Sequence, residues 1–356
     1  MKNQKLQNKM VARAVELSKK CDTLTYPNPK VGAVIFDDNG KIVAEGFTAC
    51  YGGDHAEIEA LKKINFKGEL LNMAVSLEPC NHFGKTPPCS HAILNAGIKK
   101  VFIAKKEENG SACNGTCFLE ENGVEVEFLE QFSKEVEEIN KFFFKNIRTS
   151  LPWVTVKVAR SSDQFITAKK GEPTKITGEK SQIYVHQLRA EHMAIAVGAG
   201  TVNSDNPELT VRKVKGISPQ TLIFSRNMSV NPKASLFKRV PIVITKTDDK
   251  SKAALLIKEG GKVEFFDEKA LIKDVLRTIY EKYKLNSILV EGGAQLIEEL
   301  LFEQAVDEFQ MLTSPKKLNC GIKLFSEKSF AEFSNQFILQ SETFLEKDLL
   351  QIYRKK

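Results

Sequence analysis

The chain has 356 residues, of which 42% are hydrophobic and 27% are charged. These are the proportions of an ordinary soluble globular protein, and a chain of this length favours two domains. The formal net charge of +7 is mild. It suits anionic substrates such as phosphates, but no long run of lysine and arginine indicates a nucleic-acid surface.

The N-terminal segment has apolar residues at helical spacing within 10–17, which predicts an amphipathic first helix. It lacks the uninterrupted apolar stretch of a signal peptide. The sequence also contains no run of 18 apolar residues, so no membrane span is predicted. The seven cysteines are an odd number without the pattern of a small disulfide-bonded domain. We therefore expect a cytoplasmic protein that has no membrane partner.

Strands and helices are predicted to alternate after this helix. An Asp-Asp-Asn-Gly turn at 37–40 joins strands over 31–36 and 41–46. A helix then begins at 55, with Asp54 as its expected N-cap. Further strands are predicted over 71–77 and 100–104, and a helix over 89–96. This order predicts a three-layer α/β sandwich.

Residues 55 to 89 contain a group of side chains that suits a metal. His55, Cys80 and Cys89 offer one imidazole and two thiols, a set that suits zinc and leaves a fourth position for water. Glu57 stands two residues after the histidine, where it could transfer protons without binding the metal. H-x-E followed by P-C-x-x-C is typical of zinc-dependent nucleobase deaminases, but here eight residues separate the cysteines. A structural zinc with His82 or His91 as fourth ligand is the alternative, and it would leave Glu57 without a role.

The segment between the cysteines makes a resemblance specific. E-P-C-x-H-x-G-K-T-P-P-C at 78–89, with P-N-P at 27–29 and H-A-E at 55–57, resembles the deaminase half of the bifunctional deaminase/reductases of riboflavin biosynthesis. This resemblance implies a cytidine-deaminase-like domain over 1–147. It implies that zinc-activated water removes an amino group, as ammonia, from a diaminopyrimidinone ribosyl phosphate. The implied substrate-binding residues are Asn28, which contacts the pyrimidine, and His82, Lys85 and Thr86, whose donors suit a phosphate.

A second domain is predicted to begin at about 148. A helical pattern over 131–147 is followed by a β-branched strand over 153–159. Strands over 193–197, 221–224, 241–244 and 287–290 alternate with helices over 181–190, 269–283 and 294–301. This alternation predicts a doubly wound α/β domain. The absence of G-x-G-x-x-G after a first strand speaks against a Rossmann dinucleotide site. Residues 302–356 are expected to form strands.

Glycine turns in the second half extend the resemblance. V-G-A-G-T-V at 197–202, D-N-P-E-L-T-V-R at 205–212 and V-E-G-G at 290–293 resemble the reductase half of the same family. The implied fold is dihydrofolate-reductase-like over 148–356, and the implied cofactor is NADPH. The implied cofactor-binding residues are Ala159, Lys175, Thr201, Asp205, Ser225, Gly292 and Gly293. The implied substrate-binding residues are Lys157, Pro173, Arg189, Leu209, Arg212 and Glu291.

Some positions depart from the family's pattern. Gln164 stands where the family commonly has glycine, and Lys175 where it commonly has tryptophan, which removes a possible stacking surface near the nicotinamide. The segment 107–110 reads E-E-N-G where the family usually has a D-P-N-P type, and Cys113 and Cys117 flank a turn as two expected free thiols.

Several interpretations stay open beside a bifunctional riboflavin biosynthesis enzyme. An active deaminase with an impaired reductase is one. A nucleic-acid base deaminase with an accessory domain is another, but the long loop between the cysteines speaks against it. A binding protein with a structural zinc is the third, and Glu57 argues against it. The expected partner is a phosphorylated small molecule and not a nucleic acid, and we expect a homo-oligomer.

Overall fold

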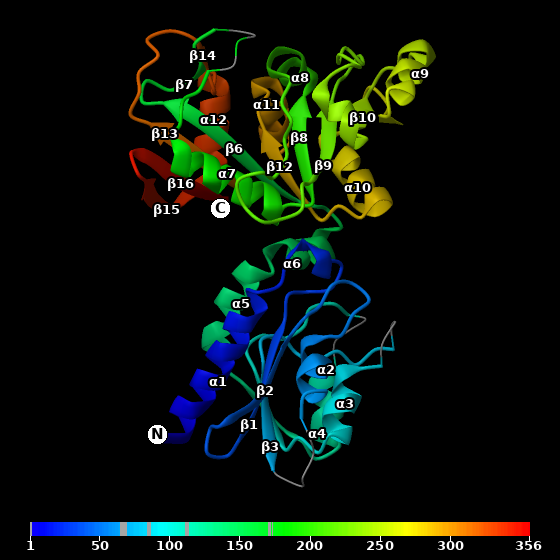
Figure 1. The fold of residues 1–356 in the computed structure, drawn as a ribbon, viewed down its shortest axis with the longest axis vertical. Coiled ribbons are helices and arrows are strands. Elements are labelled where there is room, and N and C mark those ends of the chain that lie inside the picture. The colour runs from blue at the N-terminus through cyan, green and yellow to red at the C-terminus, as the bar shows by residue number, and fades with distance from the viewer. Residues whose placement is uncertain (1, 65–69, 84–86, 111–113, 170–171, 173) are drawn as a thin grey trace. The chain divides into compact units, whose positions relative to one another are not determined.

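The computed structural model describes residues 2–64, 70–83, 87–110, 114–169, 172 and 174–356. The chain divides into two compact units, Met1–Thr149 and Ser150–Lys356 (Figure 1). The division therefore falls close to residue 148. No helix in the described ranges is both long enough and apolar enough to cross a membrane.

The first unit is built on a five-stranded sheet of order β2-β1-β3-β4-β5. Strand β1 pairs antiparallel with β2 and β3, whereas β3, β4 and β5 run parallel to one another. The bounds are Gly32–Asp37 for β1, Ile42–Phe47 for β2, Leu71–Val75 for β3, Lys100–Ile103 for β4 and Glu125–Phe128 for β5. The predicted strands over 31–36, 41–46, 71–77 and 100–104 are confirmed, and β5 was not predicted.

Helices cover both faces of this sheet, which gives the predicted three layers (Figure 1). On one face α1 (Lys2–Ser18) buries Met10 and Ala14 against alternate residues of β1. A Cβ on Gly32 would lie 2.1 Å from the Ala14 carbonyl oxygen, so only glycine allows this close approach. On the other face α2 (Ala56–Leu61), α3 (Cys89–Asn95) and α4 (Gly115–Glu121) bury their apolar residues against β1, β3 and β4. Residues 55 and 89, the two ends of the segment that contains the predicted metal ligands, therefore lie on one side of the sheet.

The helix predicted over 131–147 is two helices, α5 (Ser133–Ile139) and α6 (Lys141–Thr149). They are separated at Asn140, whose buried side-chain amide accepts from the Lys30 backbone N–H at 2.7 Å and donates to the Lys30 carbonyl at 3.0 Å. The prediction of one helix was wrong because this long-range pair stabilises the break. Short 3₁₀ helices also occur, η1 at Thr23–Thr25 and η2 at Glu130–Phe132.

The second unit is built on a nine-stranded sheet of order β11-β10-β9-β8-β12-β6-β13-β16-β15. The strands from β11 to β13 in this order are parallel, and β16 and β15 complete the sheet in antiparallel pairing. The bounds are Trp153–Ser161 for β6, Ala194–Gly198 for β8, Gln220–Phe224 for β9, Ile242–Thr245 for β10, Lys262–Phe265 for β11, Ser287–Glu291 for β12, Glu308–Ser314 for β13, Phe337–Leu345 for β15 and Asp348–Lys355 for β16. A separate pair joins β7 (Phe165–Thr167) to β14 (Ile322–Lys323).

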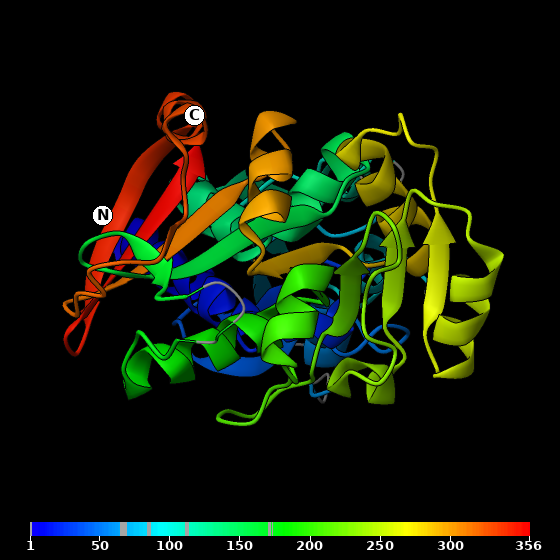
Figure 2. The ribbon, with the colours of Figure 1, turned by 90° about the horizontal axis from the view of Figure 1, so that it is seen from above.

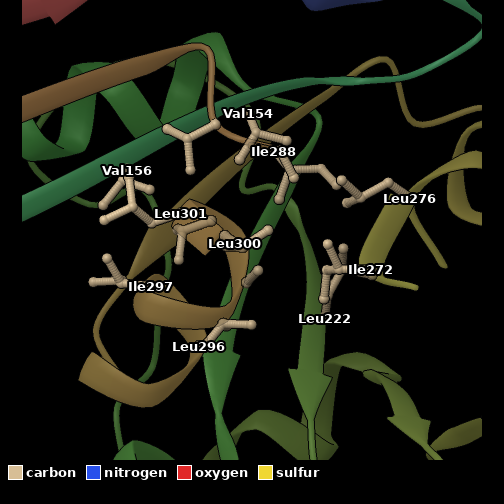
Figure 3. Close-up of a cluster of buried hydrophobic side chains, with 14 of the residues drawn as sticks. Val154, Val156, Leu222, Ile272, Leu276, Ile288, Leu296, Ile297, Leu300 and Leu301 are labelled. Atoms are coloured by element: carbon tan, nitrogen blue, oxygen red, sulfur yellow. The ribbon is translucent and has the colours of Figure 1, made fainter. Parts of the chain in front are cut away.

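Helices lie on both sides of this sheet, as Figure 2 shows. One side carries α7 (Glu179–Glu191), α8 (Ala199–Asp205), the 3₁₀ helix η3 (Ser235–Arg239) and α9 (Lys250–Lys258). The other side carries α10 (Ile272–Tyr283), α11 (Ala294–Phe302) and α12 (Glu327–Gln336). Figure 3 shows the core on the second side, where Leu300 and Leu301 of α11 pack with Val154, Val156 and Ile288 of the sheet. The doubly wound arrangement is confirmed.

Several elements of the second unit were missed, among them β7 and η3. Helix α8 begins directly after β8, where the glycine-rich sequence reads as a turn alone. Helix α9 and strand β11 add one more helix and strand to the alternating pattern. Helix α12 interrupts the C-terminal region that was predicted as strands.

Candidate functional site

The structure brings His55, Cys80 and Cys89 together in the first unit. The Nδ1 atom of His55 lies 3.6 Å from Sγ of Cys80 and 3.3 Å from Sγ of Cys89, and all three ligand atoms lie within 4.8 Å of one another. His55 is the N-cap of α2, and Cys89 is the first residue of α3. The expected cap, Asp54, is wrong: its carboxylate pairs with Lys62 at 2.6 Å instead.

Backbone groups orient the first cysteine. The Cys89 N–H donates to Sγ of Cys80 at 3.4 Å, and the Ser90 N–H donates to the Cys80 carbonyl at 3.2 Å. A side-chain hydrogen bond with the Cys89 thiol lowers the pKa of the Cys80 thiol, whereas the same pairing and burial raise the pKa of Cys89. Thiols bind a dication as thiolates, so this pair would give up its protons to a metal ion.

This donor set fits zinc. A tetrahedral zinc with bonds of about 2.0–2.3 Å holds nitrogen and sulfur ligands about 3.5 Å apart, close to both distances from His55 Nδ1. His82 and His91 do not belong to the group formed by the described residues, so a fourth protein ligand from either is not found there. Three ligands leave one position for water.

Glu57 lies in the first turn of α2, two residues from the metal group. Its side chain is 4% exposed, and burial raises the pKa of its carboxyl to about 7. A carboxyl with a pKa near neutrality can both accept and donate a proton at physiological pH.

The other predicted deaminase residues lie in loops. Asn28 is half-buried between η1 and β1, where its N–H donates to the Thr25 carbonyl at 2.9 Å. His82 follows Cys80, and its buried Nδ1 has no hydrogen-bond partner among the described residues. Lys85 and Thr86 lie outside the described residues. The orphaned nitrogen of His82 is a donor or acceptor available to a ligand.

In the second unit a buried carboxylate joins two cations. Glu291 ends β12 and lies opposite Lys157 of the neighbouring strand β6. Its Oε2 lies 2.9 Å from the Lys157 ammonium, and its two oxygens accept from Arg189 of α7 at 2.6 and 3.0 Å. Burial opposes ionisation, but Lys157 and Arg189 lower the pKa of Glu291 to about 2. The carboxylate is therefore charged at neutral pH.

Two glycine turns meet beside this group. Gly292 and Gly293 follow β12 with φ of 91° and 84°, and Gly293 is the N-cap of α11. A Cβ on Gly292 would lie 3.3 Å from Thr201 of α8, and a Cβ on Gly293 would lie 3.4 Å from the Gly198 nitrogen. The missing side chains leave a backbone cradle at a helix N-terminus, which suits a phosphate.

Six of the seven predicted cofactor residues lie at one edge of the sheet. Strands β9, β8, β12 and β6 are neighbours and parallel, so their carboxyl ends lie side by side. Each of these ends carries or leads into predicted residues, namely Ser225 after β9, Thr201 and Asp205 in α8, Gly292 and Gly293 after β12, and Ala159 near the end of β6. This edge is where open α/β sheets bind ligands.

The remaining residues differ in exposure. Leu209 is buried in the core, with φ of 51°. Arg212 pairs with Glu208, and its N–H donates to Nδ1 of the buried His186 at 3.0 Å. Lys175 is exposed, and Pro173 lies outside the described residues. The Ser225 hydroxyl accepts from the Ser229 N–H at 2.9 Å.

Sequence reasoning assigned no role to Glu78 or His186. Glu78 is buried within the E-P-C motif and accepts hydrogen bonds from Glu107 and Thr116, 29 and 38 residues away. His186 of α7 accepts from the Arg212 backbone. Only the position of Glu78 directly before Pro79-Cys80 could have drawn attention to it. The described cysteines Cys21, Cys50, Cys80, Cys89, Cys117 and Cys320 are free thiols, and Cys113 lies outside the described residues.

Comparison with known proteins identifies both domains. Residues 4–105 match the cytidine and deoxycytidylate deaminase zinc-binding region, and residues 152–345 match the RibD C-terminal domain. The riboflavin biosynthesis protein RibD of Bacillus amyloliquefaciens is 35% identical over 309 residues, which cover 85% of this chain and 82% of that protein. The RibD of Aquifex aeolicus is 34% identical over 316 residues, 87% of each chain.

Solved structures show the same similarity. A diaminohydroxyphosphoribosylaminopyrimidine deaminase/5-amino-6-(5-phosphoribosylamino)uracil reductase from Thermotoga maritima matches with a TM-score of 0.87, 32% identity and 99% coverage of both chains. The RibD of Acinetobacter baumannii matches with a TM-score of 0.86, 28% identity and 99% coverage of both chains. The chain belongs to the RibD family of riboflavin biosynthesis proteins, bifunctional enzymes with a zinc-binding deaminase domain and a reductase domain.

Proposed function

We propose that the first unit hydrolytically deaminates 2,5-diamino-6-ribosylamino-4(3H)-pyrimidinone 5′-phosphate. We propose further that the second unit reduces the ribosyl group of the deaminated product to ribityl with NADPH. The observation that carries the first assignment is the group His55, Cys80 and Cys89 with the buried Glu57 beside it. The similarity to the Thermotoga maritima deaminase/reductase supports the substrate.

His55, Cys80 and Cys89 would hold one zinc ion. Zinc, when bound, supplies the Lewis acidity that makes water nucleophilic near neutral pH. Glu57 accepts the proton of the attacking water and passes it to the departing amine. A C–O bond forms first, and a ring nitrogen gains the other proton of the water. The C–N bond then breaks, ammonia leaves, and a carbonyl remains on the ring. The pKa of about 7 for Glu57 suits both proton transfers.

Residues around the metal group would bind the rest of the substrate. Asn28 would contact the pyrimidine, and His82, Lys85 and Thr86 would bind the ribose phosphate. The unpartnered Nδ1 of His82 supports this role because a buried nitrogen without a partner gains a hydrogen bond when a ligand arrives.

The second unit would bind NADPH at the carboxyl edge of its sheet. NADPH, when bound, supplies the hydride for the ribosyl C1. Gly292 and Gly293 would cradle a phosphate of the cofactor, and Thr201 lies against Gly292. The other proposed cofactor contacts come from Ala159, Lys175, Asp205 and Ser225.

The substrate of the reductase would lie beside the buried ion pairs. Lys157 and Glu291 project from neighbouring strands on the side covered by α7, and Arg189 reaches them from that helix. We assign these three residues to the substrate together with Pro173, Leu209 and Arg212. Because Glu291 is ionised at neutral pH, it binds and orients donors rather than donating a proton.

An active deaminase with an impaired reductase is the second candidate. The exposed Lys175, which stands where the family commonly has an aromatic residue, favours it. The test is to supply the deaminated phosphoribosylaminouracil and follow NADPH oxidation directly. Oxidation of NADPH supports the bifunctional assignment. If NADPH is not oxidised over hours while zinc-dependent deamination is intact, the second candidate is supported.

The setting of the enzyme is part of the proposal. Seven cysteines, six of which the structure describes as free thiols, favour the reducing cytoplasm. We propose a homo-oligomer, which sedimentation equilibrium at several protein concentrations would test.

A further inference from the structure

The carboxylate of Glu78 is buried two residues before the metal ligand Cys80. It is 4% exposed, and both of its oxygens are used. Oε1 accepts from the Thr116 N–H at 3.0 Å and from the Thr116 hydroxyl at 2.8 Å, and Oε2 accepts from the Glu107 N–H at 3.1 Å. Removing these acceptor oxygens would leave buried donors without partners, and each such donor costs about 1–3 kcal/mol of folding free energy.

These hydrogen bonds join three separate parts of the first unit. Glu78 follows β3, Glu107 follows β4, and Thr116 is the second residue of α4. The Glu78 N–H also donates to the Lys105 carbonyl at 2.9 Å. The residue that precedes Pro79-Cys80 is thus fixed both by its backbone and by its side chain.

The first residue of α4 also contacts Pro79, the residue after Glu78. A Cβ on Gly115 would lie 1.8 Å from the Pro79 carbonyl oxygen, so the backbone of α4 packs directly on the Pro79 peptide. Asn114, just before it, has φ of 76°, which lets the chain turn into the helix at this point. No side chain fits between α4 and the segment that leads to Cys80.

Cys80 is therefore held from two sides. Helix α3 fixes it through the N–H groups of Cys89 and Ser90. Helix α4 fixes the two residues before it through Thr116 and Gly115. Glu78 does not belong to the group of ligand atoms, so its contribution to the metal site acts through the backbone.

We propose that Glu78 and Thr116 are positioning residues that place the Cys80 thiolate for zinc. This inference rests on the proposed zinc site. Groups that orient metal ligands are worth about 10–100-fold in metal affinity when they bond to the ligand. Since Glu78 acts two residues away, we expect a loss of about tenfold, the lower end of that range.

The chain offers a matched control in Glu108. It is the neighbour of Glu107, and its carboxylate pairs with Arg148 at 2.6 Å and with Lys105 at 3.0 Å. Glu108→Gln perturbs the loop after β4 while leaving the three hydrogen bonds to Glu78 in place. This variant shows how much of a change in zinc affinity comes from general destabilisation of the loop after β4.

The experiment uses the full chain and measures metal binding rather than turnover. Co²⁺ replaces zinc, and the thiolate-to-cobalt charge-transfer band reports the sulfur ligands. Zinc affinity is measured by competition with a chromophoric chelator. The variants are Glu78→Gln, which keeps volume but removes one acceptor oxygen, Thr116→Val, which removes one of three hydrogen bonds, and Thr116→Ser, which keeps the hydroxyl.

We expect Glu78→Gln and Thr116→Val to bind zinc about tenfold more weakly and to change the cobalt band. Thr116→Ser and Glu108→Gln should match the wild type. If Glu78→Gln does not fold, Thr116→Val with its serine rescue still decides. Wild-type affinity and an unchanged band in Thr116→Val would overturn the inference, as would an equal loss in Glu108→Gln. A wild-type chain without a thiolate band would remove the zinc site itself and this inference with it.

Discussion

Arg189 and Glu291 form a two-bond ion pair at the end of β12, with Nε donating to Oε1 at 2.6 Å and an NH2 proton donating to Oε2 at 3.0 Å. Lys157 adds a second cation 2.9 Å from the same carboxylate. The side chains of Glu291, Arg189 and Lys157 are 7%, 12% and 13% exposed, so solvent screens these charges weakly. The group fixes the charge distribution of the proposed substrate site.

Replacing Glu291 with Gln should destabilise the second unit. Lys157 and Arg189 would be left without their buried counter-charge, which costs about 3–5 kcal/mol. Urea unfolding followed by the fluorescence of Trp153, the one tryptophan in the sequence, reports on this unit. An unfolding free energy equal to that of the wild type would contradict the importance of the ion pairs.

The same substitution should change how stability depends on pH. The folded pKa of Glu291, about 2, lies below the ordinary value of 4.5. Its stabilising contribution is therefore fully present above about 4.5 and is lost as the pH falls toward 2. The difference in unfolding free energy between wild type and Glu291→Gln should shrink as the pH falls from 4.5 toward 2. A constant difference over this range would show that Glu291 is not the titrating group.

Glu57→Gln should stop deamination without releasing the metal. The variant keeps the side-chain volume but cannot transfer the proton, and such losses reduce turnover by about 10²–10⁴-fold. Ammonia release and zinc content are measured on the same sample. Because Glu57 is not among the ligand group, zinc content should remain that of the wild type. Wild-type ammonia release from a zinc-loaded variant would end the proposed mechanism.

Metal removal should separate the two activities. Chelation removes the metal of the first unit, and Cys80→Ser removes one of its ligands. The proposed NADPH site lies in the second unit. Deamination should disappear while reduction of the supplied deaminated substrate continues at the wild-type rate. Added zinc should restore deamination in the chelated wild type but not in Cys80→Ser. Loss of reduction in the chelated protein would mean that the metal also serves the second unit.

Lys175→Trp should strengthen NADPH use if an aromatic side chain at this position stacks on the nicotinamide end. Stacking contributes about 0.5–1.5 kcal/mol, so the KM for NADPH should fall by about 2–10-fold. Lys180→Trp is the control, since Lys180 is also an exposed lysine and lies in α7. An unchanged KM in Lys175→Trp would mean that the departure from the family pattern has no effect on the cofactor.

Local signals explain what the sequence could predict. His55 and Cys89 begin helices that carry clear apolar patterns, and Cys80 follows a buried strand, so the sequence places all three at the ends of elements of one α/β domain. The alternation of strands and helices likewise predicts two α/β domains.

What could not be predicted depends on distant partners. Asn140 ends α5 because it pairs with Lys30, 110 residues earlier. Glu78 bonds to Thr116, 38 residues later, at the start of a helix that has only seven residues. No periodicity within a short window contains these pairings.

The most direct measurement of the central claim follows ammonia release and NADPH oxidation in one tube. It uses the purified chain and the diaminopyrimidinone ribosyl phosphate, with and without NADPH. We expect ammonia in both tubes, and NADPH oxidation that begins only after deaminated product has formed. Ammonia without any oxidation of NADPH would contradict the second activity, and the absence of both signals would contradict the account as a whole.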